Sequence, residues 1–235
     1  MVNPKSFKWY HYEPMIILWC LRWYLQTALT YRQLQRMLAE RGLTIVHTTI
    51  MRWIHRFGPQ LNQKVKSHLK KTLPSWRCDE TYLKIRGQWK YLYRALDSDG
   101  NTLDFLLSAK RDKKTALRFF KKVLGNRHVK RPRVISVDKH ASYPAALTLL
   151  KAENQLKQTQ LRQVRYLNNV IEADHRFVKR KAWFKQWFQS FNTAHYTVAG
   201  YEAMNMILKG QVKAVAANDA IAQKNFIESL FGVMA

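Results

Sequence analysis

Residues 76–108 have the sequence WRCDETYLKIRGQWKYLYRALDSDGNTLDFLLS, which is rich in aromatic and apolar side chains. Three apolar runs follow one another in it, at residues 76–85, 88–96 and 102–108. Gly87 separates the first two runs, and the turn sequence Asp-Ser-Asp-Gly at residues 97–100 separates the last two. Short runs joined by such turns are typical of antiparallel strands. We therefore expect a three-stranded antiparallel meander.

The elements expected after this meander alternate between helices and strands. They lie at residues 113–124 (helix), 133–137 (short buried strand), 142–152 (helix), 164–166 (weak strand) and from about Asn169 onward (long basic helix). Three antiparallel strands followed by alternating helices and strands is the order of a ribonuclease-H-like (RNase-H-like) domain. The sequence therefore predicts an α/β fold with a mixed sheet.

The first 73 residues differ from the rest in composition. They contain 12 Lys and Arg residues, and their acids are Glu13 and Glu40 alone. Pro74 with Ser75 suits a boundary between domains. We expect an all-α helix-turn-helix domain at residues 1–74, an RNase-H-like catalytic domain at 75–190 and a C-terminal helical segment at 191–235.

Helix signals recur through this first segment. Pro14 suits the first position of a helix over residues 14–26. Thr30 with Gln33 has the spacing of a capping box, which opens a second helix. A third helix is expected from about Thr48, after a connection that contains a glycine.

The third helix has two distinct faces. Its apolar positions recur at i, i+3, i+4 and i+7, and they are Ile50, Trp53, Ile54 and Phe57. Its polar side carries Thr49, Arg52, His55 and Arg56. A helix with a basic face that follows another helix in this way has the outline of a helix-turn-helix. We expect the four polar residues to contact DNA; alternatively, the pair is a helical hairpin whose charged face meets water.

The charge balance points to a polyanionic partner. The 235 residues include 41 Lys and Arg against 15 Asp and Glu, a formal net charge of +26. Such an excess repels itself and is usually neutralised by nucleic acid.

Other classes of protein fit poorly. Two cysteines, Cys20 and Cys78, provide neither a zinc spacing nor a disulfide framework. The longest apolar stretch, residues 15–21, is too short to span a bilayer, and no signal-peptide pattern precedes it. We expect a cytoplasmic, nucleoid-associated protein with no membrane partner.

Acids are scarce, so each can be considered as a metal ligand. Asp79 lies inside the first strand, Asp138 directly follows the buried strand, and Glu172 opens the long helix. Carboxylates at such positions suit Mg²⁺ or Mn²⁺, which prefer oxygen ligands. Glu80 neighbours Asp79, but adjacent strand residues face opposite sides, so we expect that only one of them serves a given site. A single acid of this kind is most often a surface charge; three in this order are far less often accidental.

The long helix continues from Glu172 into a row of basic residues. His175, Arg176 and Lys179 share its face at i+3, i+4 and i+7, and Arg180 follows. A carboxylate followed by cations suits a metal site that leads into a track of DNA phosphates. We expect His175, Arg176, Lys179 and Arg180 to contact DNA.

Several stretches together resemble the compact bacterial DDE transposases of insertion-sequence family six. They are residues 79–82 (DETY), 91–95 (YLYRA), Asp138-Lys139 with Tyr143, 166–172 (YLNNVIE), Asp174-His175 and Lys179-Arg180, with Tyr31-Arg32, Leu34 and 37–42 (MLAERG) nearer the N-terminus. The resemblance implies a catalytic and metal-binding triad of Asp79, Asp138 and Glu172, with Lys179 as the DNA-contact lysine that follows it. The Asp138–Glu172 spacing is one residue shorter than is common in the family.

The function that follows is transposition. The chain is expected to bind the terminal inverted repeats of its insertion sequence, cut the ends to free 3′-OH groups and join them to target DNA, in a replicative reaction that yields cointegrates. Two Mg²⁺ ions, or Mn²⁺ as a substitute, are expected cofactors. The expected partners are double-stranded DNA, both at the transposon ends and at the target, and one or more further copies of the chain. No Gly-rich phosphate loop is visible, so no nucleotide cofactor is expected.

Two alternatives belong to other classes. The chain could be a non-catalytic helix-turn-helix regulator, or an RNase-H-fold endonuclease that never joins ends. Inverted repeats flanking the gene would favour the transposase.

Overall fold

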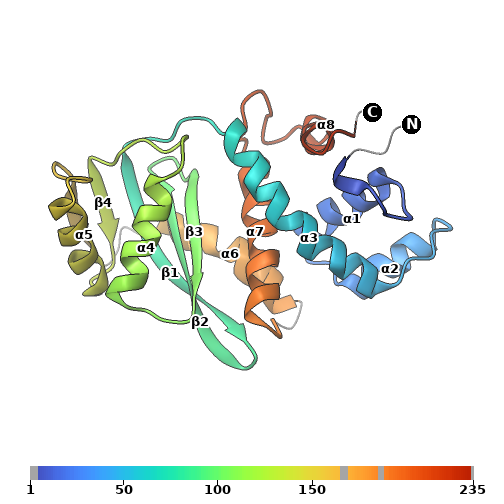
Figure 1. The fold of residues 1–235 in the computed structure, drawn as a ribbon, viewed down its shortest axis with the longest axis horizontal. Helices are drawn as coiled ribbons and strands as arrows, with labels where there is room; N and C mark the ends of the chain where they lie inside the picture. Colours follow the sequence, from blue (N-terminus) through green and yellow to red (C-terminus); the bar gives the residue numbers. More distant parts are fainter. Residues whose placement is uncertain (1–4, 165–168, 185–187, 234–235) are drawn as a thin grey trace. The chain divides into compact units, whose positions relative to one another are not determined.

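The computed structural model describes residues 5–164, 169–184 and 188–233 (Figure 1). They form two compact units, one of residues 70–179 and one of residues 1–69 together with 180–235. The C-terminal helices thus group with the N-terminal ones, whereas the sequence suggested a separate segment from 191. The predicted assignment of functions to residues 1–74, 75–190 and 191–235 stays a prediction.

The unit of residues 70–179 is built on a five-stranded mixed sheet. Its strands are β1 (Ser75–Ile85), β2 (Gln88–Asp97), β3 (Thr102–Ser108), β4 (Val134–Val137) and β5 (Gln160–Gln163). They lie in the order β3-β2-β1-β4-β5. The first three are antiparallel, as the turn residues predicted, and β1, β4 and β5 are parallel. The predicted α/β, RNase-H-like fold is confirmed.

The last strand begins earlier than predicted. The expected strand at residues 164–166 lies partly outside the described residues, and β5 precedes it because Gln160–Gln163 pair with Val134–Val137. Three of its four side chains are polar and exposed, and only Leu161 is half-buried, since β5 is an edge strand. Alternating apolar residues, the usual strand signal, are therefore missing there.

One face of the sheet carries the core of this unit. Helices α4 (Lys113–Leu124) and α5 (Ser142–Ala152) pack together, and α4 crosses the sheet on this face (Figure 1). Asp112 caps α4 by accepting a hydrogen bond from the Thr115 amide. The largest core side chains are aromatic: Trp76, Tyr93, Phe119, Phe120 and Tyr143.

The other face of the sheet meets helix α6 (Asn169–Phe184). Arg94 of β2 lies opposite Asp79 of β1 in the antiparallel register, so both side chains leave this face. Arg94 forms an ion pair with Asp174 of α6, and the two side chains are 0% and 6% exposed. A buried ion pair thus ties α6 to the strands that carry Asp79.

The second unit is helical throughout. It contains α1 (Pro14–Gln26), α2 (Tyr31–Ala39), α3 (His47–Val65), α7 (Phe191–Leu208) and α8 (Ala220–Leu230), with short 3-10 helices at Lys5–Phe7 and Lys66–His68. The predicted capping box of Thr30 and Gln33 is present at the start of α2. The predicted apolar face of α3 is buried. Whether α2 and α3 act as a DNA-reading helix-turn-helix stays a prediction.

Helices α3 and α7 cross closely because glycines meet at the crossing. A Cβ on Gly200 would lie 2.7 Å from a methyl carbon of Leu25, and one on Gly58 would lie 3.1 Å from the Tyr196 carbonyl oxygen. A Cβ on Gly200 would also lie 3.2 Å from the Gly58 Cα, so either addition would require the neighbouring atoms to shift. No helix in the described part of the chain combines the length and apolarity needed to cross a membrane.

Lys181 is buried in this helical unit, and we expect it to make stability depend on pH. Its side-chain nitrogen donates a hydrogen bond to the Leu25 carbonyl oxygen. Burial lowers its pKa from 10.5 to about 7. Between these values the folded chain holds the neutral amine while the unfolded chain is protonated, so the free energy of unfolding rises as pH increases through this window.

The Lys181→Met variant should lose this pH dependence. Relative to wild type, it should be stabilised most near pH 7, by about 1.4 kcal/mol for each unit of the pKa shift at most, and progressively less toward pH 10. Urea unfolding at several pH values measures the difference. Lys179→Met, which changes an exposed lysine on the same helix, is the control. A difference that stays constant with pH would contradict the buried, neutral state of Lys181.

Candidate active site

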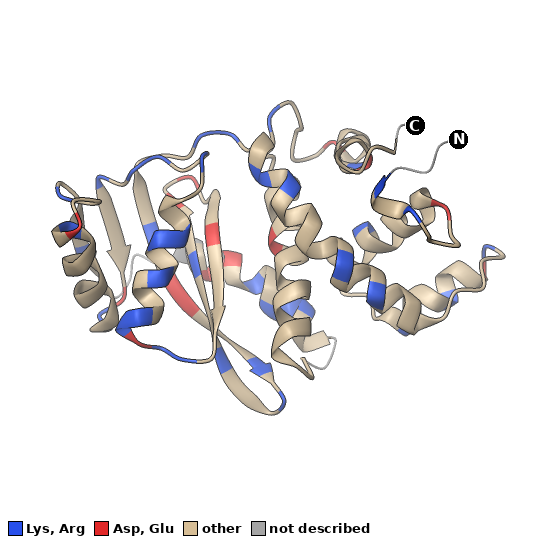
Figure 2. Cartoon of the chain, in the orientation of Figure 1, with Lys and Arg blue, Asp and Glu red and all other residues tan. Residues whose placement is uncertain are grey.

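Three carboxylates meet at the middle of the sheet. One oxygen from each of Asp79, Glu80 and Asp138 lies within 4.8 Å of the others; we call these residues the acidic cluster. Arg77 of β1 pairs with Ser136 of β4, and Asp79 and Asp138 each follow two residues later. Because parallel strands in register send equivalent side chains to the same face, Asp79 and Asp138 lie side by side. Figure 2 shows that acidic residues are far fewer than basic ones along the chain.

Glu80 lies in this cluster although its strand position faces away from Asp79. The expectation that only one of the two serves a given site stays a prediction. Glu80 does face the buried side of β1, opposite to Asp79. However, β4 pairs with β1 only as far as Arg77, so no paired strand covers the adjacent edge of β1 at Glu80. The long Glu80 side chain can therefore bring its carboxylate close to those of Asp79 and Asp138.

Arg111, which the sequence did not single out, bridges two of these acids. Its Nε and Nη2 donate to the Glu80 carboxylate at 3.1 and 3.3 Å, and Nη2 also donates to Asp138 Oδ2 at 2.8 Å. Burial raises the pKa of Glu80, and the hydrogen bonds from Arg111 oppose that rise. Arg111 directly precedes the cap of α4, and nothing in the sequence distinguishes it from the other 40 Lys and Arg residues.

The loop after β4 fixes the other oxygen of Asp138. The His140 amide donates to Asp138 Oδ1 at 3.0 Å. The His140 ring lies 2.8 Å from the Ser142 hydroxyl at the start of α5, so it organises this turn. Both oxygens of Asp138 are therefore held from this chain, and 34% of its side chain stays exposed.

His175 lies against Asp79 from the α6 side. Its Nε2 is 3.6 Å from Asp79 Oδ2, and its side chain is 4% exposed. Burial lowers the pKa of His175, which favours the neutral imidazole. Of the predicted DNA contacts on α6, His175 is thus buried, whereas Arg176, Lys179 and Arg180 are exposed.

Glu172 is not part of the acidic cluster in the described structure. It lies in the first turn of α6 and is exposed. It precedes His175 by three residues, so both leave the same side of α6, the side that meets Asp79. The structure therefore brings Asp79 and Asp138 together. It places Glu172 on the neighbouring helix α6, one turn before His175.

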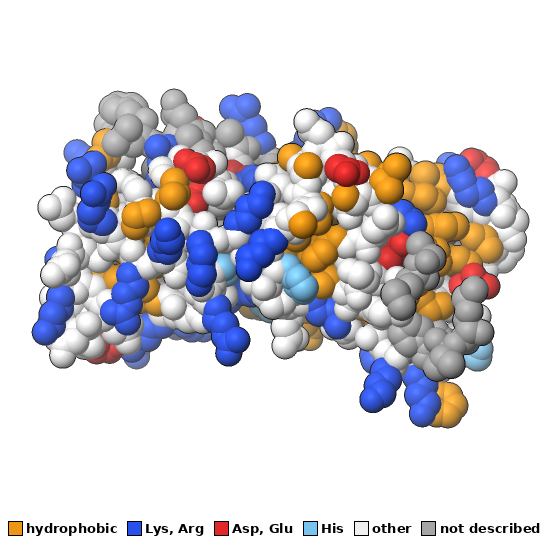
Figure 3. All heavy atoms as spheres, turned by 90° about the horizontal axis from the view of Figure 1, so that it is seen from above, with side chains coloured by type: hydrophobic (Ala, Val, Ile, Leu, Met, Phe, Trp, Pro, Cys, Tyr) orange, Lys and Arg blue, Asp and Glu red, His pale blue; other side chains and the backbone are white. Residues whose placement is uncertain are grey.

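The four predicted DNA contacts of α3 differ in their surroundings. Arg52 and Arg56 are exposed, and the Arg56 guanidinium lies 5.8 Å from the Tyr10 ring. Thr49 and His55 are half-buried; His55 contacts the rings of Tyr31 and Tyr196, and burial lowers its pKa. In the view of Figure 3, Lys and Arg side chains are spread over the visible surface of each unit, with fewer acids among them.

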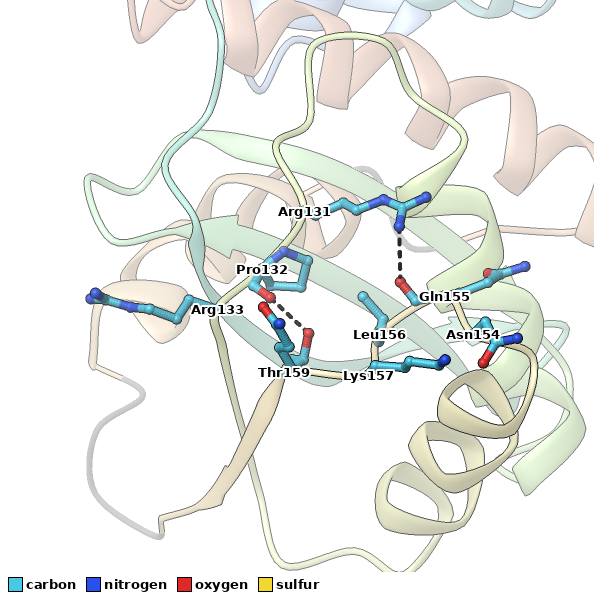
Figure 4. Close-up of a pocket in the computed structure, with 9 residues that line it drawn as sticks. Arg131, Pro132, Arg133, Asn154, Gln155, Leu156, Lys157 and Thr159 are labelled. Atoms are coloured by element: carbon cyan, nitrogen blue, oxygen red, sulfur yellow. Dashed lines mark hydrogen bonds between the residues drawn. The ribbon is translucent and has the colours of Figure 1, made fainter.

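A pocket lies away from these acids. It is lined by residues 131–133 and 154–159. In Figure 4, the Arg131 guanidinium donates a hydrogen bond to the Gln155 carbonyl oxygen, and the Thr159 hydroxyl donates one to the Pro132 carbonyl oxygen. These residues precede β4 and β5, so the pocket is at the opposite end of β4 from Asp138. It contains no acid and contributes nothing to the cluster.

Comparison with known proteins decides the family. Residues 73–211 match the sequence model of a family described as a DDE domain. The chain is 36% identical over 203 residues to the transposase for insertion sequence-like element IS431mec of Staphylococcus aureus (strain N315). The aligned residues cover 86% of this chain and 88% of the relative. The chain belongs to the DDE transposase family. The resemblance to insertion-sequence family six is thereby confirmed.

One further relative and two solved structures can be compared with this DDE transposase. The transposase for insertion sequence element IS257 in transposon Tn4003 of Staphylococcus aureus is also 36% identical, with the same coverage. Among solved structures, the dimeric HTLV-2 integrase catalytic core domain in complex with magnesium has a TM-score of 0.44 at 12% identity, covering 63% of this chain and 94% of that one. The BIV integrase catalytic core has a TM-score of 0.39 at 15% identity, covering 58% of this chain and 84% of that one.

Proposed function

We propose that this transposase binds the terminal inverted repeats of its insertion sequence, cuts each end to free a 3′-OH and joins that hydroxyl to target DNA. The observation that carries the proposal is the pair of Asp79, on β1, and Asp138, directly after β4, held side by side in a chain of formal net charge +26. Acids that repel each other in so basic a chain make chemical sense as ligands of cations.

The donor set suits a hard divalent cation. Asp79 and Asp138 offer carboxylate oxygens, which Mg²⁺ prefers and Mn²⁺ accepts, and we propose that Glu172 of α6 completes the set. When bound, a pair of such ions activates the attacking oxygen and stabilises the leaving one. The protein's own part is to hold the ligands: the His140 amide and Arg111 orient Asp138, while neutral His175 packs against Asp79.

DNA would approach along two basic surfaces. Arg176, Lys179 and Arg180 of α6 are exposed and follow Glu172 along the helix, so they can hold phosphates next to the reacting bond. On α3, Thr49, Arg52, His55 and Arg56 would read the inverted repeat. Because two ends must be joined in one event, we propose that a homodimer or larger assembly acts on both ends and the target.

Arg52→Ala should weaken binding to the inverted repeat about tenfold, and binding to random DNA less, because it removes an exposed cation from the reading helix. If Arg52 contacts a phosphate instead, both affinities should fall equally. The slope of log affinity against log salt concentration should then become shallower by about one. Fluorescence anisotropy at several salt concentrations measures both. Arg41→Ala is the matched control, because Arg41 is also an exposed arginine but lies after α2 and donates a hydrogen bond to the Met37 carbonyl oxygen. Unchanged binding in Arg52→Ala would remove α3 from the DNA interface.

Joining assays test the proposed function. Purified protein is incubated with labelled DNA carrying the inverted repeats that flank its gene, supercoiled plasmid, and Mg²⁺ or Mn²⁺. Labelled ends covalently joined to plasmid by single strands are expected, since a replicative reaction leaves the second strand uncut. Cutting without joining would favour the endonuclease alternative, and binding without cutting would favour a DNA-binding regulator.

A further inference from the structure

The acidic cluster is bridged by a cation of its own chain. Arg111 makes three hydrogen bonds, two to Glu80 and one to Asp138, and its Nη2 serves both acids at once. Its positive charge therefore lies within hydrogen-bond distance of a carboxylate that we propose as a metal ligand. A divalent cation at Asp138 would meet the electrostatic field of this guanidinium at close range.

Of the two acids, Glu80 holds Arg111 in place more strongly than Asp138 does. Its side chain is 1% exposed, against 34% for Asp138, and it takes both Nε and Nη2 of the guanidinium. Attraction between charges is stronger where water is excluded, and a two-pronged arginine–carboxylate contact fixes geometry. The position of Arg111 is thus set mainly by Glu80, and Asp138 meets the remaining donor.

We propose that Glu80 is the counter-ion of Arg111 and thereby sets the affinity of Asp79 and Asp138 for divalent metal. This inference rests on the proposed function, in which those two aspartates hold the metal. With Glu80 in place, the Glu80–Arg111 pair is neutral overall, and Asp138 keeps its negative charge for the metal while Arg111 still orients it. With Glu80 neutralised, the guanidinium is balanced by Asp138 itself, and less negative charge is left for the metal.

Opposite effects from the two partners distinguish this role from a structural tie. Glu80→Gln should weaken Mn²⁺ binding by roughly tenfold, because an uncompensated cation then lies beside Asp138. Arg111→Gln should tighten it several-fold, because the cation is gone and the Glu80 carboxylate adds to the cluster. The double variant Glu80→Gln/Arg111→Gln should return to within about twofold of wild type, since the net charge is restored.

The experiment measures Mn²⁺ affinity of the full chain without DNA, from the electron paramagnetic resonance signal of the free ion. Arg111→Lys keeps the charge but not the two-pronged contact, so its affinity should not rise as in Arg111→Gln; this comparison carries the test if Glu80→Gln fails to fold by circular dichroism. Asp104→Asn is the control, because Asp104 is likewise 1% exposed and ion-paired, with Lys122, yet lies on β3.

The outcomes separate this inference from the proposed function. Shifts in the same direction for Glu80→Gln and Arg111→Gln, or no shift in either, would overturn the counter-ion role. Asp79→Asn should weaken Mn²⁺ binding severely in the same assay. If Asp79→Asn binds Mn²⁺ normally, the metal site itself is misplaced and both proposals fail; if it does not bind while the Glu80 and Arg111 variants bind like wild type, only the counter-ion role fails.

Discussion

Asp79→Asn is expected to reduce cleavage and strand transfer by at least about a thousandfold while binding to the inverted repeat stays within about twofold. The substitution keeps the size of the side chain but removes the charge that would hold the metal. Binding should persist because we propose that it depends on exposed cations of α3 and α6, such as Arg52 and Lys179. Joining assays report the loss, and anisotropy with the same DNA reports retained binding.

Matched acids test whether position or charge alone matters. Asp99→Asn changes an exposed carboxylate in the turn after β2 and should leave strand transfer unchanged. Glu172→Gln should lose activity as severely as Asp79→Asn if Glu172 is the third ligand. Glu80→Gln should instead recover much of its activity at high Mn²⁺, because it weakens metal binding without removing a proposed ligand. Strand transfer at the wild-type rate by Asp79→Asn would refute the metal role of the cluster.

The sequence was sufficient to predict the parts of the fold that depend on local patterns. The turn at residues 97–100 and the glycine at 87 predicted the meander, and Asp138 after the buried strand predicted one edge of the site. The juxtaposition of Asp79 and Asp138 follows once β4 pairs in parallel beside β1 with Ser136 opposite Arg77, as the structure shows. Thr30 and Gln33 likewise predicted a helix start from local hydrogen bonding.

Contacts between distant segments were not predictable in the same way. Arg111 and Glu80 are 31 residues apart, and their pairing depends on where β4 stops rather than on any local pattern. The rule of alternating strand faces did not predict that the Glu80 carboxylate lies near that of Asp79, because it describes directions at Cα and not the reach of a long side chain. Strand β5 was misplaced because pairing with β4, and not its own composition, makes it a strand.

The ion pair between Arg94 and Asp174 is another such contact, and its loss should have the largest effect on stability. Asp174→Asn should lower the free energy of unfolding of residues 70–179 by about 3–5 kcal/mol, because Arg94 stays charged within the sheet after its carboxylate partner is neutralised. Urea unfolding, monitored by hydrogen exchange of the β2 amides, measures this change in the free energy of unfolding. Glu153→Gln breaks an exposed pair with Lys121, 2.8 Å apart, and should cost less than about 1 kcal/mol.

Replacing both partners tests whether the charge or the contact matters. Arg94→Met/Asp174→Leu removes both charges of this pair, and apolar side chains of similar volume can fill the interface between β2 and α6. Stability should therefore return to within about 1 kcal/mol of wild type. Activity should stay reduced even so, because the pair also fixes the rotation of α6, which carries His175 against Asp79 and Glu172 one turn before it. A double variant with wild-type stability and wild-type strand transfer would show that packing alone positions α6, whereas a stable but slow one would show that the ion pair aligns the third acid with the other two.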